Sequence, residues 1–464
     1  MQSSNISLTM QEHHYEELRA FLFKDGKEAV AFFICTKAIA LGRTRLLTKE
    51  IHFLTDEACP DREVNKVTWT TEAIVPLLDK AEEEGLSLVK IHCHPCGTPH
   101  FSPTDDESDR TLFPSVIDWV EHDFPHASIV LLPDGAMFGR SIDENGNFAS
   151  LSSISVANDN LDIWFAGEGV SEVPASAKRI AQAFGNGTYE ALSRLRVGVV
   201  GCSGTGMPLI TALNLNHVGE LVIVDPDVIE DGNRNRIATA TPEDAEIATP
   251  KVVNALQAIE SRGLGTVVHT FHADILQSDV IEALGSCDLI FGCVDSVIGR
   301  HILNKISSCY LIPFFDLGVR IDADGEGGVD AVNASLMFIK PCGASLLSQG
   351  VYTFEQLNAE FMLADDPEEY HRQLKEGYVK GVNVDRPAVG AINGILANLA
   401  AEEVTARIHG YRLEPSSQFA VRRIVFDEGE IWNEEADELP CPEFIKIVAR
   451  GDQKPLLNLP FIGV

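Results

Sequence analysis

Apolar residues in the first third of the chain follow both strand and helix spacing. Buried runs or strict alternation predict strands at 29–35, 45–52, 86–91 and 127–132. Helical spacing predicts one helix over residues 71–84. Strands and a helix mixed in this way predict a compact α+β unit over residues 1–150.

The pattern changes after this unit. Residues 151–177 are rich in Ser, Asn, Asp, Gly and Pro and predict a linker with one short strand near 163–165. Over residues 178–464 strands alternate with helices, and the strands are predicted at 196–200, 220–224, 267–271, 289–293 and 313–317. Such alternation predicts a parallel, doubly wound sheet. The predicted fold class is therefore α/β, with an α+β domain followed by a doubly wound domain.

Composition limits the classes of partner and the cellular compartment that we expect for this protein. The 464 residues carry 36 basic and 69 acidic side chains, a net charge of -33, which disfavours nucleic acid because phosphates are repelled. The acidity is interpreted as solubility or an acidic proteome, or as fit to a basic protein partner. The polar start, the lack of a membrane-length apolar run and ten scattered cysteines predict a cytoplasmic protein without a membrane span.

Two histidines and an aspartate predict a metal centre in the first domain. His92 and His94 alternate at the end of a predicted strand, so both imidazoles can point to one side. Ser102 is predicted to cap a helix that Pro103 begins, which places Asp105 in the first turn. Two His and one Asp leave a fourth position for water, as in catalytic zinc sites. Taken singly, these pieces are ordinary surface or capping features.

The whole string His92-x-His94-Pro95, followed by Ser102-x-x-Asp105, resembles the signature of JAMM metalloproteases, and the resemblance covers residues 10–140. It implies a cytidine-deaminase-like fold, zinc on His92, His94 and Asp105, and cleavage of an amide or isopeptide after a ubiquitin-like C-terminus. It also implies Glu28 as general acid/base and Ser102 as a hydrogen-bond donor to the oxyanion. A thiolate site on the nearby cysteines is the alternative, although the His and Asp set is already complete.

A glycine-rich turn predicts a phosphate site in the second domain. Gly201, Gly204 and Gly206 follow a strand and open a helix, so backbone N–H groups can face phosphates. Asp225 ends the next strand, where an acid normally binds a ribose hydroxyl. On these residues alone, NAD is an alternative to ATP.

The residues after Asp225 favour ATP, because an Arg and a Lys that converge on the turn suit a triphosphate. They resemble the signature of the ThiF, MoeB and ubiquitin-activating family at Asp225, Asp227, Asn233, Asn235, Arg236, Lys251 and Asp295. The resemblance implies a Rossmann-like domain that adenylates a protein C-terminus. It implies that Asp225 binds the ribose, that Asn233, Arg236 and Lys251 hold phosphates, and that Asp295 holds magnesium.

The sequence departs from the family pattern at the position of the family's structural zinc. Ser345, Ser348 and Phe444 stand where three of the four cysteine ligands would be, so no structural zinc is expected. In the crossover region, about 340–385, Cys342 is a weak candidate for a thioester, and the alternative is a reaction that stops at the adenylate.

The family implies a homodimer, in which Arg179 is a weak candidate for reaching the partner's ATP site. The best-matching position there is Gln182.

Three functions fit these patterns. The favoured one is a bacterial ubiquitin-like pathway, with an isopeptidase and an activating domain that act on the same C-terminus, a small modifier protein and a conjugating enzyme as partners, and antiviral defence as a context. The second is processing and adenylation of a sulfur-carrier protein for cofactor biosynthesis. The third is a scaffold without catalysis, which the intact zinc and ATP sets disfavour.

Overall fold

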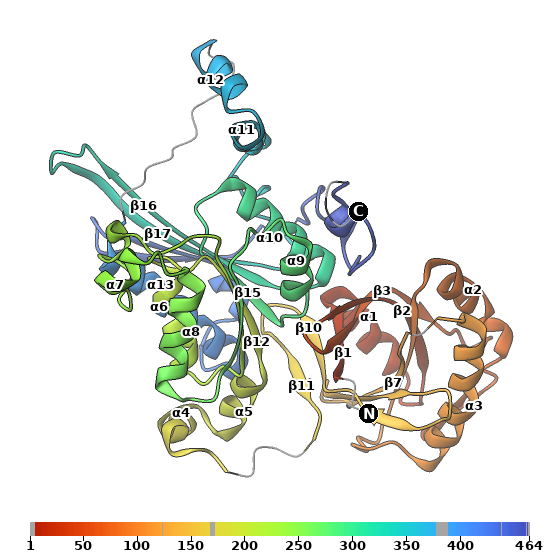
Figure 1. Ribbon diagram of the computed structural model, residues 1–464. Coiled ribbons are helices and arrows are strands. Elements are labelled where there is room, and N and C mark those ends of the chain that lie inside the picture. Colours follow the sequence, from red (N-terminus) through yellow and green to blue (C-terminus); the bar gives the residue numbers. More distant parts are fainter. Residues whose placement is uncertain are drawn as a thin grey trace. The chain divides into compact units, whose positions relative to one another are not determined.

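The computed structural model describes residues 5–122, 124–167, 172–376, 388–437, 439–460 and 462. The chain forms two compact units (Figure 1). Unit 1 comprises Met1–Glu168, Cys309–Leu311 and Ile447–Val464, and unit 2 comprises Gly169–Ser308 and Ile312–Lys446. In the described part of the chain, every helix is too short or too polar to cross a membrane.

Unit 1 is built on one nine-stranded mixed sheet. Its order is β11 (Ile163–Phe165), β10 (Ser153–Ala157), β1 (Asn5–Gln11), β3 (Arg43–Phe53), β2 (Val30–Ala40), β6 (Ser87–Cys93), β7 (His126–Leu131), β8 (Met137–Ile142) and β9 (Phe148–Ser150). A separate hairpin joins β4 (Asp61–Glu63) and β5 (Lys66–Thr68). The helices are α1 (Glu12–Leu22), α2 (Val75–Glu84) and α3 (Pro103–Val120).

The sheet of unit 1 has a hydrophobic core on each face. Alternate residues of β2 separate the two: Ala31 and Phe33 join a core with α1, while Phe32 and Ile34 join a core with α2 and α3. Because both faces are covered, the first six residues of β2, 30–35, are all apolar instead of alternating with polar ones. This burial explains why its run was recognisable in the sequence.

The predicted linker differs from the structure. Residues 153–157 and 163–165 form β10 and β11 of the unit 1 sheet, with β10 parallel to β1. Part of the segment, 168–171, lies outside the described residues. The polar composition that suggested a linker reflects an edge of the sheet, where one strand is short and half-buried.

Unit 2 contains an eight-stranded sheet. Its order is β14 (Val267–Phe271), β13 (Glu220–Val224), β12 (Arg196–Val200), β15 (Leu289–Gly292), β16 (Phe314–Ala323), β17 (Val329–Ile339), β18 (Val421–Val425) and β19 (Glu430–Glu434). Its helices are α4 (Lys178–Phe184), α5 (Asn186–Arg194), α6 (Gly206–Leu215), α7 (Pro242–Glu246), α8 (Lys251–Arg262), α9 (Ser278–Gly285), α10 (Val297–Tyr310), α11 (Phe354–Asp365), α12 (Pro367–Glu376) and α13 (Gly390–His409).

The predicted doubly wound order is present in the first five strands, but the sheet is not wholly parallel. Strands β14 to β16 are parallel, and β12 lies between β13 and β15, where the order reverses. Strands β17, β18 and β19 are antiparallel. The expectation of a parallel sheet was therefore wrong for these strands, because the short β16–β17 connection permits only a hairpin. Figure 1 shows this long hairpin.

Candidate functional site

The end of β6 and the start of α3 bring the predicted metal ligands together in unit 1. His92 lies on β6, and His94 follows the strand directly. Ser102 caps α3 with Pro103 as its first residue, as the sequence predicted, and its Oγ accepts a hydrogen bond from the backbone N–H of Asp105 at 3.2 Å. The cap turns the Asp105 side chain back toward the strand.

The three side chains form a set that fits a metal ion. Oδ1 of Asp105 lies 3.0 Å from Nε2 of His92, and Oδ2 lies 3.3 Å from Nε2 of His94. The two Nε2 atoms are 3.2 Å apart. A tetrahedral ion with bonds of 2.0–2.1 Å separates its ligands by about 3.3 Å. A metal site needs at least three His, Cys, Asp or Glu side chains whose ligand atoms lie close together. Within the described ranges, His92, His94 and Asp105 are the one group that meets this condition.

Hydrogen bonds outside the set orient its members. Nδ1 of His94 donates to the carbonyl of Thr98 at 2.9 Å, which leaves Nε2 as the ligand atom. Burial opposes protonation of His94, but Asp105 and the Thr98 carbonyl raise its pKa overall. Burial also opposes the charge on Asp105, yet hydrogen bonds from both histidines and Ser102 hold its pKa well below the usual range. The aspartate is therefore a carboxylate, as a metal ligand must be.

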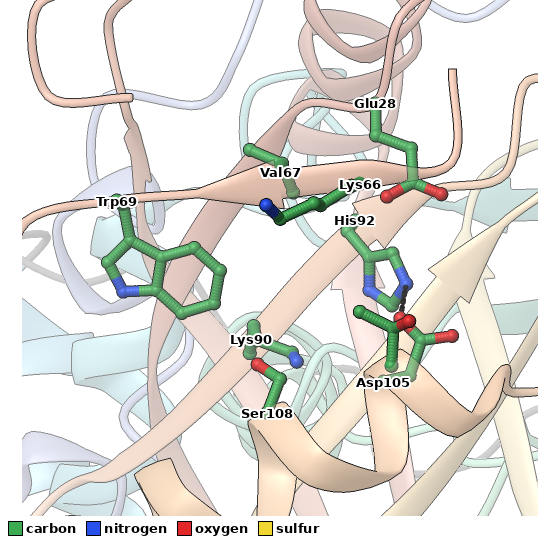
Figure 2. A pocket seen from close by; sticks show the side chains of 9 residues that line it. Glu28, Lys66, Val67, Trp69, Lys90, His92, Asp105 and Ser108 are labelled. Carbon is green, nitrogen blue, oxygen red and sulfur yellow. Dashed lines mark ion pairs between the residues drawn. The ribbon is translucent and has the colours of Figure 1, made fainter. Parts of the chain in front are cut away.

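Glu28 lines the same small pocket as His92 and Asp105 (Figure 2). The pocket has a volume of about 20 Å³, enough for about one water molecule. Burial, and then the charge of Asp105, raises the pKa of Glu28 to about 7. The hairpin β4–β5 holds its backbone, because Glu28 N donates to the carbonyl of Glu63 at 2.8 Å and Arg62 Nε donates to the carbonyl of Glu28 at 3.0 Å.

Ser102, predicted to donate to an oxyanion, lies beside Asp105 at the start of α3, and its role stays a prediction. Its hydroxyl donates to Oδ2 of Asp105 at 2.7 Å, and Ser102 is not among the residues that line the pocket. The pocket is also lined by residues that were not predicted from the sequence, which include Lys66, Val67, Trp69 and Lys90. The hairpin that carries Lys66 and Val67 has strands of three residues, too short for a periodicity signal.

In unit 2, the carboxyl ends of β12, β13 and β15 meet at a second site. Gly201 follows β12 with φ of +96°, and a Cβ there would lie 2.5 Å from the carbonyl oxygen of Cys293 after β15. Gly206 begins α6, and a Cβ there would lie 1.7 Å from the carbonyl oxygen of Gly201. Only glycine fits at either position, so the turn stays tight and the N-terminus of α6 faces the cavity.

Two acids and a lysine converge beside this turn. Asp225, after β13, accepts hydrogen bonds from the backbone N–H of Cys202 at 2.6 Å and of Asp227 at 2.8 Å. Lys251, the first residue of α8, donates to Asp227 Oδ2 at 2.7 Å and lies 4.0 Å from Asp225 Oδ1. Burial raises the pKa of Asp225, and the charge of Lys251 opposes this shift. The buried Asp225 carboxylate and the buried Lys251 ammonium therefore lie next to each other, beside the glycine turn.

The other predicted nucleotide residues divide into two groups. Asn233, Arg236 and Asp295 line the cavity, and Arg236 also reaches the Gly turn, since its Cδ would lie 2.9 Å from a Cβ on Gly204. Asn235 does not line the cavity, and its Oδ1 accepts a hydrogen bond from Arg236 at 3.1 Å.

The cavity has a volume of about 860 Å³, within the range of small-molecule sites. Arg300 and Asn393 also line it and were not predicted. Nε of Arg300 donates to the buried Asp316 at 2.9 Å. Oδ1 of the buried Asn393 has no hydrogen-bond partner among the described residues. Arg300 follows Asp295 by only five residues, and this closeness in the sequence was a signal that it could line the same cavity. Asn393 comes from a distant helix, so the sequence gave no signal for it.

The weaker candidates lie elsewhere. Arg179 is on α4 and donates to Gln182 of the same chain at 2.9 Å. Cys342 is half-buried after β17, and residues 377–385 of the predicted crossover region lie outside the described residues. At the position of the family's structural zinc, Ser345 N donates to Ser348 Oγ at 2.9 Å, and Phe444 packs on His301 with ring centroids 5.6 Å apart.

A mixed sheet whose parallel half carries a glycine turn and an acid at its switch point defines unit 2 as a Rossmann-like α/β fold. The chain belongs to the ThiF family, whose model matches residues 176–438.

Curated relatives match parts of the chain. It is 33% identical over 118 residues to the SAMP-activating enzyme E1 of Haloferax volcanii, covering 25% of this chain and 43% of that protein. It is 31% identical over 114 residues to the adenylyltransferase and sulfurtransferase MOCS3 of Danio rerio, covering 25% and 24%. The chain thus spans less than half the length of these two relatives.

Among solved structures, the chain is similar to E. coli MccB with ATP, with a TM-score of 0.44 and 18% identity over 60% of this chain and 76% of that chain.

Proposed function

We propose that unit 2 is an ATP-dependent adenylyltransferase that activates the C-terminal carboxylate of a small ubiquitin-like or sulfur-carrier protein. The observation that carries the proposal is the cavity in which Gly201, Arg236, Lys251 and Asp225 line one space at the switch point of the sheet. Membership of the ThiF family and the names of the matching relatives support it.

The reaction follows from the charges in the cavity. A carboxylate oxygen of the partner attacks the α-phosphorus of ATP, the bond to the bridging oxygen breaks, and pyrophosphate leaves with that bond's electrons. Lys251 and Arg236 stabilise negative charge that develops on the phosphates, and Asp225 holds the ribose. Asp295 is the residue that would hold a magnesium ion with the phosphates, since carboxylates and phosphate oxygens are its preferred ligands.

ATP–pyrophosphate exchange tests this function with a ubiquitin-like protein that ends in Gly-Gly. Lys251→Met should weaken ATP binding about tenfold to hundredfold in calorimetry, because it removes a charge-assisted contact to phosphate. Lys446→Met is the matched control, since the Lys446 side chain is 70% exposed. Equal ATP affinity in the two variants, or no ATP binding by the wild-type protein, would count against the proposal.

A second function is favoured by the metal-ligand set of unit 1. We propose that this unit is a zinc-dependent peptidase or isopeptidase that cuts after a ubiquitin-like C-terminus, as the JAMM resemblance implies. His92, His94 and Asp105 would hold the ion, which when bound supplies Lewis acidity and a more acidic water. Glu28 takes a proton from the attacking water and delivers it to the leaving amine. Its place in the same pocket supports this role.

Glu28→Gln separates zinc binding from catalysis. The variant should keep its zinc, measured by elemental mass spectrometry, because Glu28 is not a ligand. It should cut a ubiquitin-like protein with a C-terminal extension about 10²- to 10⁴-fold more slowly, the usual contribution of a general acid/base. Glu63→Gln, an exposed change in the neighbouring hairpin, is the control. Unchanged cleavage by Glu28→Gln would refute the role of Glu28, and wild-type protein without zinc would refute the metal site.

The two proposed activities act on one kind of C-terminus, which links them in a bacterial modifier pathway. Processing of a sulfur carrier before its adenylation is the alternative. A homodimer, a conjugating enzyme as partner and a cytoplasmic location remain predictions.

A further inference from the structure

A buried ion network lies beside the candidate metal ligands of unit 1. Lys90 on β6 forms an ion pair with Asp109 on α3, and the two side chains are 3% and 0% exposed. Arg140 on β8 donates to Oδ2 of Asp109 through Nε at 3.0 Å and through a terminal nitrogen at 2.7 Å. None of these three residues is among the candidate metal ligands. The network lies in the core, where burying charged groups costs free energy.

Sequence spacing connects this network to the ligands. Lys90 and His92 are two residues apart on one strand and therefore share a face of the sheet. Asp105 and Asp109 are four residues apart on one helix and therefore share a side of it. The pairs face each other, so Lys90–Asp109 and His92–Asp105 are two adjacent links between the same strand and the same helix. Figure 2 shows Lys90 beside Ser108 of α3 and the His92–Asp105 link as a dashed line.

Arg140 is itself held in place. Its guanidinium carbon lies 3.7 Å from the ring centroids of both Phe101 and Phe148. Phe101 directly precedes the α3 cap Ser102. The network thus ties the first two turns of α3 to β6 on one side and to β8 on the other.

We propose that Asp109, held between Lys90 and Arg140, is a positioning residue that fixes the rotation of α3 so that Asp105 faces His92 and His94, and thereby sets the affinity of the site for zinc. A carboxylate on a helix can meet two strand-borne imidazoles only when the helix keeps one rotation and one height. The Lys90–Asp109 link fixes both, one helical turn beyond the ligand. This inference rests on the proposed zinc site.

Zinc affinity of the full-length chain tests the proposal, measured by competition with a chromophoric chelator. Asp109→Asn keeps the shape of the side chain and removes its charge, and should weaken zinc binding about 10- to 100-fold, the usual effect of losing a group that orients a metal ligand. Lys90→Met is a second variant, to be used if Asp109→Asn fails to fold. It removes the cation on β6 but leaves Asp109 paired with Arg140. Lys90→Arg should retain most of the affinity because it keeps the cation.

A purely structural role is distinguished by a matched control. Val116→Ala removes buried packing from the same helix without touching a charge. It should lower the unfolding temperature of the metal-free protein yet leave zinc affinity unchanged. If Asp109→Asn and Lys90→Met bind zinc within threefold of wild type, or if Val116→Ala weakens binding as much as they do, the positioning role is wrong while the metal site stands. If wild-type protein binds no zinc, the metal site fails and this inference fails with it.

Discussion

Two carboxylates in unit 1 show how environment assigns different chemistry to similar groups. Asp105 accepts hydrogen bonds from Ser102 and contacts both histidines, so it stays ionised. Glu28 is buried close to the charge of Asp105, and its pKa is raised to about 7. Carboxyl groups whose pKa values are pushed apart in this way commonly divide into a charged and a proton-carrying partner. The pair therefore suits a ligand and a proton carrier.

Gly206 is the residue of the glycine turn that tolerates a side chain least. Gly206→Ala should abolish measurable ATP binding, because its Cβ would overlap the carbonyl of Gly201 and displace the turn. It should also lower the free energy of unfolding by about 1–3 kcal/mol, because the overlap forces the packed turn to shift. Calorimetry with ATP and chemical denaturation measure the two effects.

Gly187→Ala in helix α5 is the control, since a Cβ at Gly187 meets no atom within 4 Å. Alanine favours a helix over glycine by up to about 1 kcal/mol, so this variant should be as stable as wild type or more so. Normal ATP affinity in Gly206→Ala would mean that the turn does not contact the nucleotide.

Local strings of residues were the most predictable part of the sites. His92, His94 and Asp105 lie within fourteen positions of one another in the chain, so strand alternation and a helix cap were enough to bring them together. Asn393 reaches its cavity from a helix almost two hundred residues after the Gly turn. No local pattern can reveal such a residue, because only the tertiary fold places it there.

At the scale of elements, the start of α3 connects stability to the proposed metal site. Ser102→Ala removes the cap and should cost about 1 kcal/mol of stability, as cap losses usually do. It also removes the hydroxyl that donates to Asp105, so zinc affinity should fall in the chelator assay.

Thr353→Ala removes an equivalent capping box from α11 in unit 2. It should cost a similar free energy in thermal unfolding and leave zinc affinity unchanged. Equal zinc affinity in the Ser102 and Thr353 variants would show that the cap serves the helix alone.

Most central strands were recognisable because burial on both faces gives continuous apolar runs. The helix predicted over 71–84 was recognisable from the helical spacing of its apolar residues. The structure divides that helix into a short 3-10 turn, Thr71–Ala73, and α2. The edge strands β9 and β19 escaped prediction because they are short and polar, whereas the edge strands β11 and β14 were predicted. Their pairing depends on partners far away in the chain.

At the scale of the molecule, buried neutral histidines make both units sensitive to acid. Burial lowers the pKa of His126 in unit 1 to about 4 and that of His301 in unit 2 to about 4. Below about pH 6.5 these histidines therefore bind protons in the unfolded chain but stay neutral in the folded chain. Their contribution to the free energy of unfolding is fully present above about pH 6.5 and is lost as the pH falls toward 4. The loss should be roughly 2–3 kcal/mol for each histidine.

Chemical denaturation at pH 7 and pH 5 measures this loss. His126→Asn should reduce the difference, because asparagine can accept the hydrogen bond that Leu88 N–H donates to His126 Nδ1 without taking up a proton. A variant with the same pH dependence as wild type would show that His126 titrates normally in the folded protein.

Unit 1 is assembled from separated pieces of the chain, and its last piece is Ile447–Val464. Thr36 Oγ1 donates to the carbonyl of Ala449 at 2.7 Å, and Ile39 N donates to Asp452 Oδ2 at 2.7 Å. On the ribosome, β2 therefore emerges long before these hydrogen-bond partners in the last piece of unit 1, and at 5–20 residues per second the delay is on the order of tens of seconds. During that interval unit 2 is synthesised, so unit 1 gains its segment Ile447–Val464 only after unit 2 has been made.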